Sequence, residues 1–284
     1  MPDLVYLNGR YLPRAEAVVS VEDRAFLFGD GVYEVTRAYK GTLIEAARHL
    51  RRLERGLAGL ALSFTPDALP DISARLLADN GLTTGEVLVY WQVTRGVAPR
   101  LHQFPAAGTA PTVYASAAPF TPPHARRGAG VSAISHPDIR WARCDLKTVN
   151  LLPNVLAKQA AVAAGAYEAV LIRDGAVTEG STTNVFGVLD GVIRTAPRTN
   201  YILPGITREV VLELAHREGL HVREDPLLAE DLPRLSELFL TGTTNDVMPV
   251  VTLDGRAVGD GRPGPIAGRL YAVLAAHFGV PGGD

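Results

Sequence analysis

Several residue types are scarce in this 284-residue chain, and each scarcity excludes a class of protein. Cys144 is the only cysteine, so the chain forms no internal disulfide and no two-cysteine redox or metal motif, which suits a reducing compartment. The sequence has no uninterrupted apolar run of about 18 residues and no signal-like segment at its start, so we expect a cytoplasmic protein without a membrane span. A formal net charge of −2 leaves no basic field for nucleic acid. We therefore expect a small-molecule partner and no metal site.

Lysine is scarce as well, although the chain is rich in arginine. Of its 28 basic side chains only Lys40, Lys147 and Lys158 are lysines. A guanidinium stays protonated and cannot act as an amine nucleophile, so any catalytic amine is one of these three. Exposure at a hairpin tip explains Lys40, and helix propensity with solvation explains Lys158. Lys147 lies in a loop, where it is either an ordinary surface lysine or the amine.

Local patterns predict two α+β domains, and an apolar content of 47% is enough for a sizeable core. Asn8-Gly9, Lys40-Gly41 and Asp190-Gly191 separate apolar runs, as the central residues of hairpin turns do. The stretch 118–130 is rich in proline and glycine and has no periodicity, which predicts a linker. We therefore place the domains at 1–121 and 122–284. Apolar spacing predicts helices over Ala46–Leu62, Pro70–Asn80, Asn150–Ala164, Ile206–Glu218 and Ile266–Phe278, and strands that include Glu86–Thr94, Thr112–Ala117, Glu168–Arg173 and Glu237–Thr241.

One carboxylate stands out by its neighbours. Glu179 belongs to the polar run Val177–Asn184, which lies between two expected strands and contains hydroxyls and a glycine. Such a run is either an ordinary turn or a cleft in which the carboxylate stabilises a cationic ring nitrogen. The residues alone leave both interpretations open.

Three segments carry groups suited to anions. The helix that follows Pro204-Gly205 begins with amides that have no intrahelical partner, where a phosphate binds with help from the helix dipole. Gly242-Thr243-Thr244 follows a strand and offers hydroxyls beside an accessible backbone. Arg100 and His102 lie two residues apart in an extended loop and so project to one side, which suits a carboxylate. Arg52 would add a cation on a helix, although a solvated helix face explains it equally well.

Four motifs, in order and with similar spacing, resemble the fold-type IV pyridoxal-phosphate enzymes, and the resemblance covers essentially the whole chain. The motifs are Phe28–Glu34, Asp138–Asn150, Val177–Ser181 with Asn184–Gly187, and Leu203–Arg208. This resemblance implies a two-domain α+β fold, with a smaller N-terminal domain and a larger C-terminal domain that has a barrel-like core. Within the group, Val93–Pro105 and Ile139–Asp145 are most similar to the D-amino acid aminotransferases.

The resemblance also implies which residues bind the cofactor, pyridoxal 5'-phosphate. Lys147 would form the Schiff base and move the proton during transfer, and Glu179 would pair with the pyridine nitrogen. Leu203 would pack on the ring. The phosphate would be bound by Arg52, the amides of Ile206 and Thr207, and Thr243.

For the substrate, the resemblance implies a site shared between two subunits. Tyr33, Arg100 and His102 would bind the substrate α-carboxylate, the last two from the partner subunit of a homodimer. The implied reaction is ping-pong transamination between D-amino acids and 2-oxo acids. Alternatives are a branched-chain L-amino acid aminotransferase, a lyase of the aminodeoxychorismate type that eliminates pyruvate, and a degenerate paralogue that binds the cofactor without turnover.

The chain departs from the D-amino acid aminotransferase pattern in three places. Gly242 stands where a serine is usual, Thr182-Thr183 stands where serines are usual, and Pro204 takes a place often held by lysine. We expect the hydroxyl changes to affect cofactor release or side-chain preference and to leave the reaction type unchanged.

Overall fold

The computed structural model describes residues 3–282, and backbone contacts divide the chain into two compact units. The first unit runs to Thr121 and takes in the short segment Leu146–Asn150. The second comprises Pro122–Asp145 and the chain from Leu151 onward. Lys147 therefore belongs to the first unit, and Glu179 belongs to the second.

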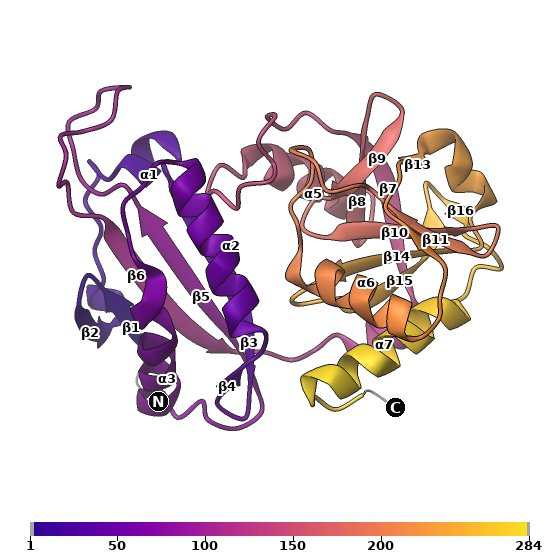
Figure 1. Cartoon of the computed structure of the whole chain (residues 1–284), viewed down its shortest axis with the longest axis horizontal. Coiled ribbons are helices and arrows are strands. Elements are labelled where there is room, and N and C mark those ends of the chain that lie inside the picture. Colours follow the sequence, from indigo (N-terminus) through magenta and orange to yellow (C-terminus); the bar gives the residue numbers. More distant parts are fainter. Residues whose placement is uncertain (1–2, 283–284) are drawn as a thin grey trace. The chain divides into compact units, whose positions relative to one another are not determined.

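The first unit is an antiparallel sheet with two long helices on one face (Figure 1). The strand order is β2-β1-β6-β5-β3-β4. Residues of both helices pack with the strands in one apolar core around the fully buried Trp91. The elements are β1 (Leu4–Leu7), β2 (Arg10–Pro13), α1 (Arg24–Phe28), β3 (Gly31–Tyr39), β4 (Thr42–Leu43), α2 (Ala46–Gly59), α3 (Leu69–Asp79), β5 (Glu86–Thr94) and β6 (Thr112–Pro119).

The two hairpins expected in this unit are confirmed, and their geometry explains the residues at the turns. Asn8 and Gly9 connect β1 and β2 with φ of 49° and 87°, and Lys40 and Gly41 connect β3 and β4 with φ of 49° and 81°. Positive φ at both central residues is the requirement of a type I′ turn, which asparagine and glycine meet at little cost. Lys40 lies at an exposed tip, as its place in the turn predicts.

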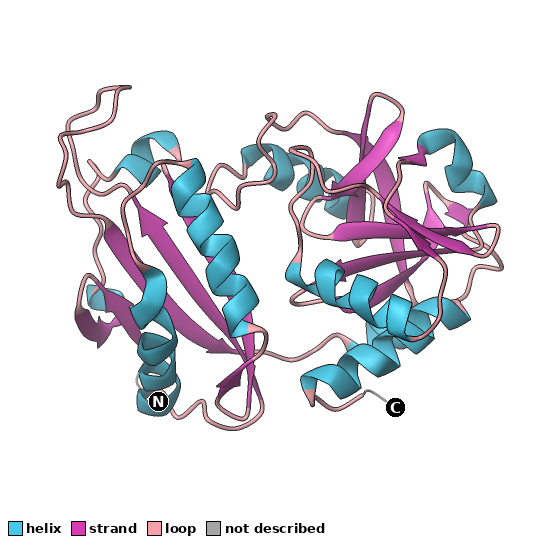
Figure 2. Cartoon of the chain, viewed as in Figure 1, coloured by secondary structure: helices cyan, strands magenta, loops and turns pink. Residues whose placement is uncertain are grey.

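The second unit is built on a sheet that curls into a half-barrel (Figure 2). Its strand order is β12-β11-β10-β14-β15-β7-β8-β9-β13, with β16 paired to β15. Helices α6 and α7 pack on β14 and β15, and α5 packs on β7 and β8. The elements are α4 (His124–Ala129), β7 (Val131–Pro137), α5 (Leu152–Ala163), β8 (Glu168–Arg173), β9 (Ala176–Gly180), β10 (Asn184–Leu189), β11 (Val192–Thr195), α6 (Ile206–Arg217), β12 (Val222–Arg223), β13 (Leu227–Leu228), β14 (Glu237–Gly242), β15 (Asp246–Leu253), β16 (Arg256–Ala257) and α7 (Pro265–Phe278).

The structure corrects two expectations about local elements. The stretch 118–130 is no plain linker, since its first residues complete β6 and His124–Ala129 form helix α4. This helix is held by a long-range contact, because Arg127 is buried and its Nη2 lies 3.0 Å from Oδ2 of Asp246. The helix expected over Ala46–Leu62 ends early, at Gly59, and Ala61 has a φ of 48°. None of the helices described between residues 3 and 282 is both long and apolar enough to cross a lipid bilayer.

Candidate active site

The segment that carries Lys147 is fixed to the start of β3. The amide of Tyr33 donates to the carbonyl of Lys147 at 3.0 Å, and Val149 donates to the carbonyl of Gly31 at 3.1 Å. Lys147 is half-buried, and its Nζ lies 4.3 Å from the centroid of the Tyr33 ring. Lys147 and Tyr33, both predicted from the sequence, therefore lie together, and Lys147 is no freely solvated loop lysine.

Arg52 lies inside the first unit, so the interpretation as a solvated helix face is wrong for this residue. Its side chain is 4% exposed, and the Glu34 side chain that it meets is fully buried. Arg52 donates to Glu34 through Nε at 2.7 Å and through Nη2 at 2.8 Å, and Nδ1 of His49 lies 2.8 Å from the same carboxylate. Burial opposes ionisation of Glu34, but Arg52 and His49 hold its pKa well below the ordinary value. The carboxylate thus fixes the direction of the Arg52 guanidinium.

Arg100 and His102 lie around one aromatic ring, that of Phe28. Cζ of Arg100 is 5.2 Å from the ring centroid, and the His102 ring is 5.5 Å from it. Both side chains are exposed. The buried Arg24 stacks on Phe28 at 4.8 Å and donates through Nη1 to the carbonyl of Leu101 at 2.7 Å. The predicted carboxylate-binding pair is therefore brought together, on a loop that Arg24 anchors.

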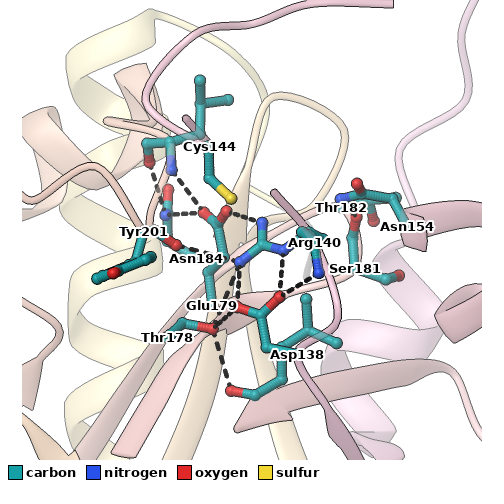
Figure 3. Close-up of polar contacts among 12 residues, drawn as sticks. Asp138, Arg140, Cys144, Asn154, Thr178, Glu179, Ser181, Thr182, Asn184 and Tyr201 are labelled. Atoms are coloured by element: carbon teal, nitrogen blue, oxygen red, sulfur yellow. Dashed lines mark hydrogen bonds and ion pairs between the residues drawn. The ribbon is translucent and has the colours of Figure 1, made fainter. Parts of the chain in front are cut away.

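Glu179 lies in strand β9 and is only 5% exposed, so the interpretation as an ordinary turn is wrong. Figure 3 shows its carboxylate among polar side chains. Arg140 donates through Nη1 to Oε1, while Oε2 accepts from Nδ2 of Asn184 at 3.0 Å and from the amide of Leu203 at 2.9 Å. Burial raises the pKa of Glu179 to about 7 from an ordinary 4.5, and Arg140 limits the rise.

Sheet register brings Arg140 to Glu179. Strand β7 runs parallel to β8, which is antiparallel to β9, and the amide of Asp138 continues this pairing with a bond of 2.8 Å to the carbonyl of Ile172. Asp138 accepts from Nε and Nη2 of Arg140 at 2.9 and 2.8 Å and from Arg173 at 3.0 Å. Asp138 and Arg140 were not predicted as site residues from the sequence, because only the strand order places them beside Glu179.

Two segments predicted to bind phosphate lie close to the turn 181–184. A Cβ on Gly205 would lie 2.1 Å from Oδ1 of Asn184, so a larger residue there would have to displace the Asn184 side chain. Gly205 precedes helix α6 and has no side chain to cap it, so the amides of Ile206 and Thr207 face outward from the helix start. In the second segment, a Cβ on Gly242 would lie 3.7 Å from Cγ2 of Thr183.

A buried carboxylate organises the same turn. The Glu168 side chain is fully buried in β8 and accepts from the hydroxyls of Ser181, Thr182 at 2.9 Å and Thr183 at 3.1 Å. The threonines that replace the more usual serines keep their hydroxyls in this arrangement. No local pattern identified Glu168, because the hydroxyls that it accepts from are more than ten residues away in the chain.

Each unit by itself contains groups that fit a part of pyridoxal 5'-phosphate. The second unit contains a buried acid suited to a ring nitrogen and a helix start suited to a phosphate, and the first unit contains an amine. Thr241 adds a buried hydroxyl without a partner among the described residues, and it pairs with Asn184 across β10 and β14, so both side chains lie on one face of the sheet. The first unit holds Tyr33, Arg52, Arg100, His102 and Lys147, and the second holds Glu179, Leu203, Ile206, Thr207 and Thr243.

Comparisons with known proteins show the family to which the chain belongs. Residues 31–253 match the family model of amino-transferase class IV. The chain is 44% identical to D-alanine aminotransferase of Bacillus licheniformis over 95% of each chain, and 42% identical to that of Staphylococcus haemolyticus over 94% of each.

Solved structures of similar fold include two branched-chain amino acid aminotransferases. The enzyme of Escherichia coli superposes with a TM-score of 0.89 at 28% identity, covering 98% of this chain and 95% of that one. The T.th. enzyme in complex with N-(5'-phosphopyridoxyl)-L-glutamate gives a TM-score of 0.87 at 31% identity, over 99% of this chain and 96% of that one.

Proposed function

The chain belongs to the class IV aminotransferases, and from this premise we propose that it transfers the amino group of D-amino acids to 2-oxo acids with pyridoxal 5'-phosphate as cofactor. The observation that carries this proposal is the 44% identity to a D-alanine aminotransferase over 95% of both chains. The pair Arg100 and His102, which meets at Phe28, supports it from the structure. When bound, the cofactor supplies the electron sink of the reaction.

The residues of this chain would then have distinct tasks. Lys147 would be the amine that links the cofactor covalently and carries the proton of the substrate Cα. Glu179 would accept a hydrogen bond from the protonated ring nitrogen, and the burial of its carboxylate would exclude water from that bond. Leu203, whose amide donates to Glu179, would pack on the ring.

Phosphate binding divides between a guanidinium and a helix start. The amides of Ile206 and Thr207 face outward at the positive end of α6, and Thr243 adds a hydroxyl. Arg52 contributes a cation whose orientation Glu34 fixes through two hydrogen bonds. We propose that these four groups bind one phosphate.

We further propose that the protein acts as a homodimer, in which Arg100 and His102 bind the substrate α-carboxylate in the partner subunit's site, together with Tyr33 of that subunit. Exposed apolar side chains on the same loop support this proposal, since Leu101 and Phe104 are 52% and 57% exposed in the single chain. Large exposed apolar groups mark surfaces that bind other proteins. The buried, unpaired Cys144 supports the expected cytoplasmic location.

One assay tests the proposed reaction. Purified holoenzyme is given D-alanine or L-leucine with 2-oxoglutarate, and the new 2-oxo acid is measured. We expect pyruvate from D-alanine and little product from L-leucine. A preference for L-leucine would support a branched-chain aminotransferase, the second candidate, which the structural neighbours favour. Pyruvate release from aminodeoxychorismate without an amino acceptor would support the lyase instead.

A further inference from the structure

The hydrogen bonds of Glu179 leave room for one more donor, and they show which oxygen receives it. A carboxylate offers about four lone-pair positions, two on each oxygen. Asn184 and the amide of Leu203 fill both positions on Oε2. Arg140 fills one position on Oε1. The remaining position lies on Oε1, so a ring N–H would bind the oxygen that Arg140 already binds.

Arg140 is fixed for this contact by other residues. Its Nε and Nη2 form a two-point ion pair with Asp138, and Nη2 also lies 3.1 Å from the carbonyl of Tyr201. The Arg140 side chain is 5% exposed, and that of Asp138 is fully buried. The Nε/Nη2 edge of the guanidinium thus binds Asp138, and the remaining nitrogen, Nη1, is directed at Glu179 (Figure 3).

The other titratable groups around Glu179 leave Arg140 as its direct source of positive charge among the described residues. Burial raises the pKa of the Cys144 thiol to about 11, so this neighbour is neutral at physiological pH. Burial opposes ionisation of Asp138, but its hydrogen bonds to Arg140 lower its pKa to about 2, so it carries a negative charge. Arg173 contacts Asp138 and the carbonyl of Arg140, with no bond to Glu179.

We propose that Arg140 is a positioning residue that keeps the proton shared by Glu179 and the cofactor ring nitrogen on the nitrogen; this inference rests on the proposed function. A proton shared by two groups resides on the more basic one. The positive charge beside Oε1 limits the rise in basicity that burial gives the carboxylate, and so favours the proton on the nitrogen. Without Arg140 the buried carboxylate becomes a stronger base and takes the proton, which leaves a neutral acid and a neutral ring.

The charge of one adjacent guanidinium determines how far the proton affinity of Glu179 changes. An adjacent guanidinium lowers the pKa of a carboxyl group by about 1–3 units, which is about a 10- to 1,000-fold change in proton affinity. A change of this size moves the shared proton from one partner to the other. A neutral ring withdraws electrons less strongly, so amino transfer slows while substrate binding does not change.

The test is nitrogen-15 NMR of the resting enzyme loaded with pyridoxal 5'-phosphate labelled in the ring. In the unaltered protein we expect the shift of a protonated nitrogen at about pH 7, and in Arg140→Gln the shift of an unprotonated one. Arg140→Lys keeps the charge and should restore the protonated shift. The rate of the first half-reaction with D-alanine should fall in Arg140→Gln, with KM unchanged. A protonated nitrogen in Arg140→Gln would overturn the proposal.

Two further variants separate charge at Glu179 from general damage to the fold. Arg173→Gln removes the same charge from Asp138 but has no bond to Glu179, so the nitrogen should stay protonated; an unprotonated shift there would also overturn the proposal. Asp138→Asn with Arg140→Gln removes both charges of the buried Asp138–Arg140 ion pair and should behave as Arg140→Gln does. If the unaltered protein neither binds the cofactor nor transfers amino groups, the proposed function fails. If the enzyme is active but the nitrogen-15 shift is the same in the unaltered protein and in Arg140→Gln, only this inference is contradicted.

Discussion

Replacing Gly242 with serine should make the protein bind its cofactor more tightly. Gly242 ends β14 directly before Thr243, and its φ is outside the left-handed region. A Cβ there would lie 3.5 Å from Nδ2 of Asn245 and farther from all other described atoms, which is ordinary contact. Serine therefore fits without displacing its neighbours. A hydrogen bond to a charged group contributes about 1.5–3 kcal/mol, which is about 10- to 100-fold in affinity.

The assay is a titration of the cofactor-free protein with pyridoxamine 5'-phosphate, which forms no covalent bond with Lys147 and so reports the non-covalent contacts alone. Gly242→Ala is the matched control, because it adds the same Cβ without the hydroxyl. We expect tighter binding in Gly242→Ser only, and no gain for pyridoxamine, which lacks the phosphate. Equal affinities of the serine and alanine variants would refute the reasoning and the assignment of this loop to the phosphate.

Three other changes test separate parts of the structure. Arg24→Gln removes the hydrogen bond to the carbonyl of Leu101. A lost bond of about 1.4 kcal/mol should raise KM for D-alanine about tenfold and leave kcat little changed. Steady-state kinetics measures both constants, and an unchanged KM would contradict the role of the loop in binding substrate. In the cofactor-free chain the pKa of Glu179 is about 7, against an ordinary 4.5, so the folded state binds more protons than the unfolded state between these values. The free energy of unfolding of the protein should then fall as pH rises from about 4.5 to about 7, by on the order of 3 kcal/mol more than in Glu179→Gln. Urea titrations across this pH range measure the difference, and parallel pH profiles of the two proteins would contradict the prediction. Leu76→Ala empties a fully buried position and should lower the free energy of unfolding by about 2–5 kcal/mol in the same titration, and a loss below about 1 kcal/mol would refute its place in the core.

Elements defined by local chemistry were predictable from the sequence. The turns at Asn8-Gly9 and Lys40-Gly41 need residues that tolerate positive φ, and the structure has positive φ there. The strand expected over Glu86–Thr94 and the helix expected over Ile206–Glu218 are present, the helix one residue shorter. By contrast, α4 is six residues long, too short to show helical periodicity, and a distant ion pair stabilises it.

The candidate site divides in the same way. Motif resemblance predicted Lys147 and Glu179, since the chemistry requires an amine and an acid. It could not identify Arg140, because the contact to Glu179 depends on the parallel pairing of β7 with β8 and on the register of β9. The helical pattern alone could not predict that Arg52 is buried, since its buried partner Glu34 lies on a strand 18 residues earlier.

We propose that this aminotransferase links its cofactor through Lys147, one of its three lysines. Reduction of the holoenzyme with borohydride makes the link permanent, and peptide mapping by mass spectrometry then locates it. We predict the cofactor on Lys147 alone, and we predict that Lys147→Ala abolishes transfer from D-alanine to 2-oxoglutarate. Cofactor on Lys40 or Lys158, or an active Lys147→Ala variant, would contradict the account.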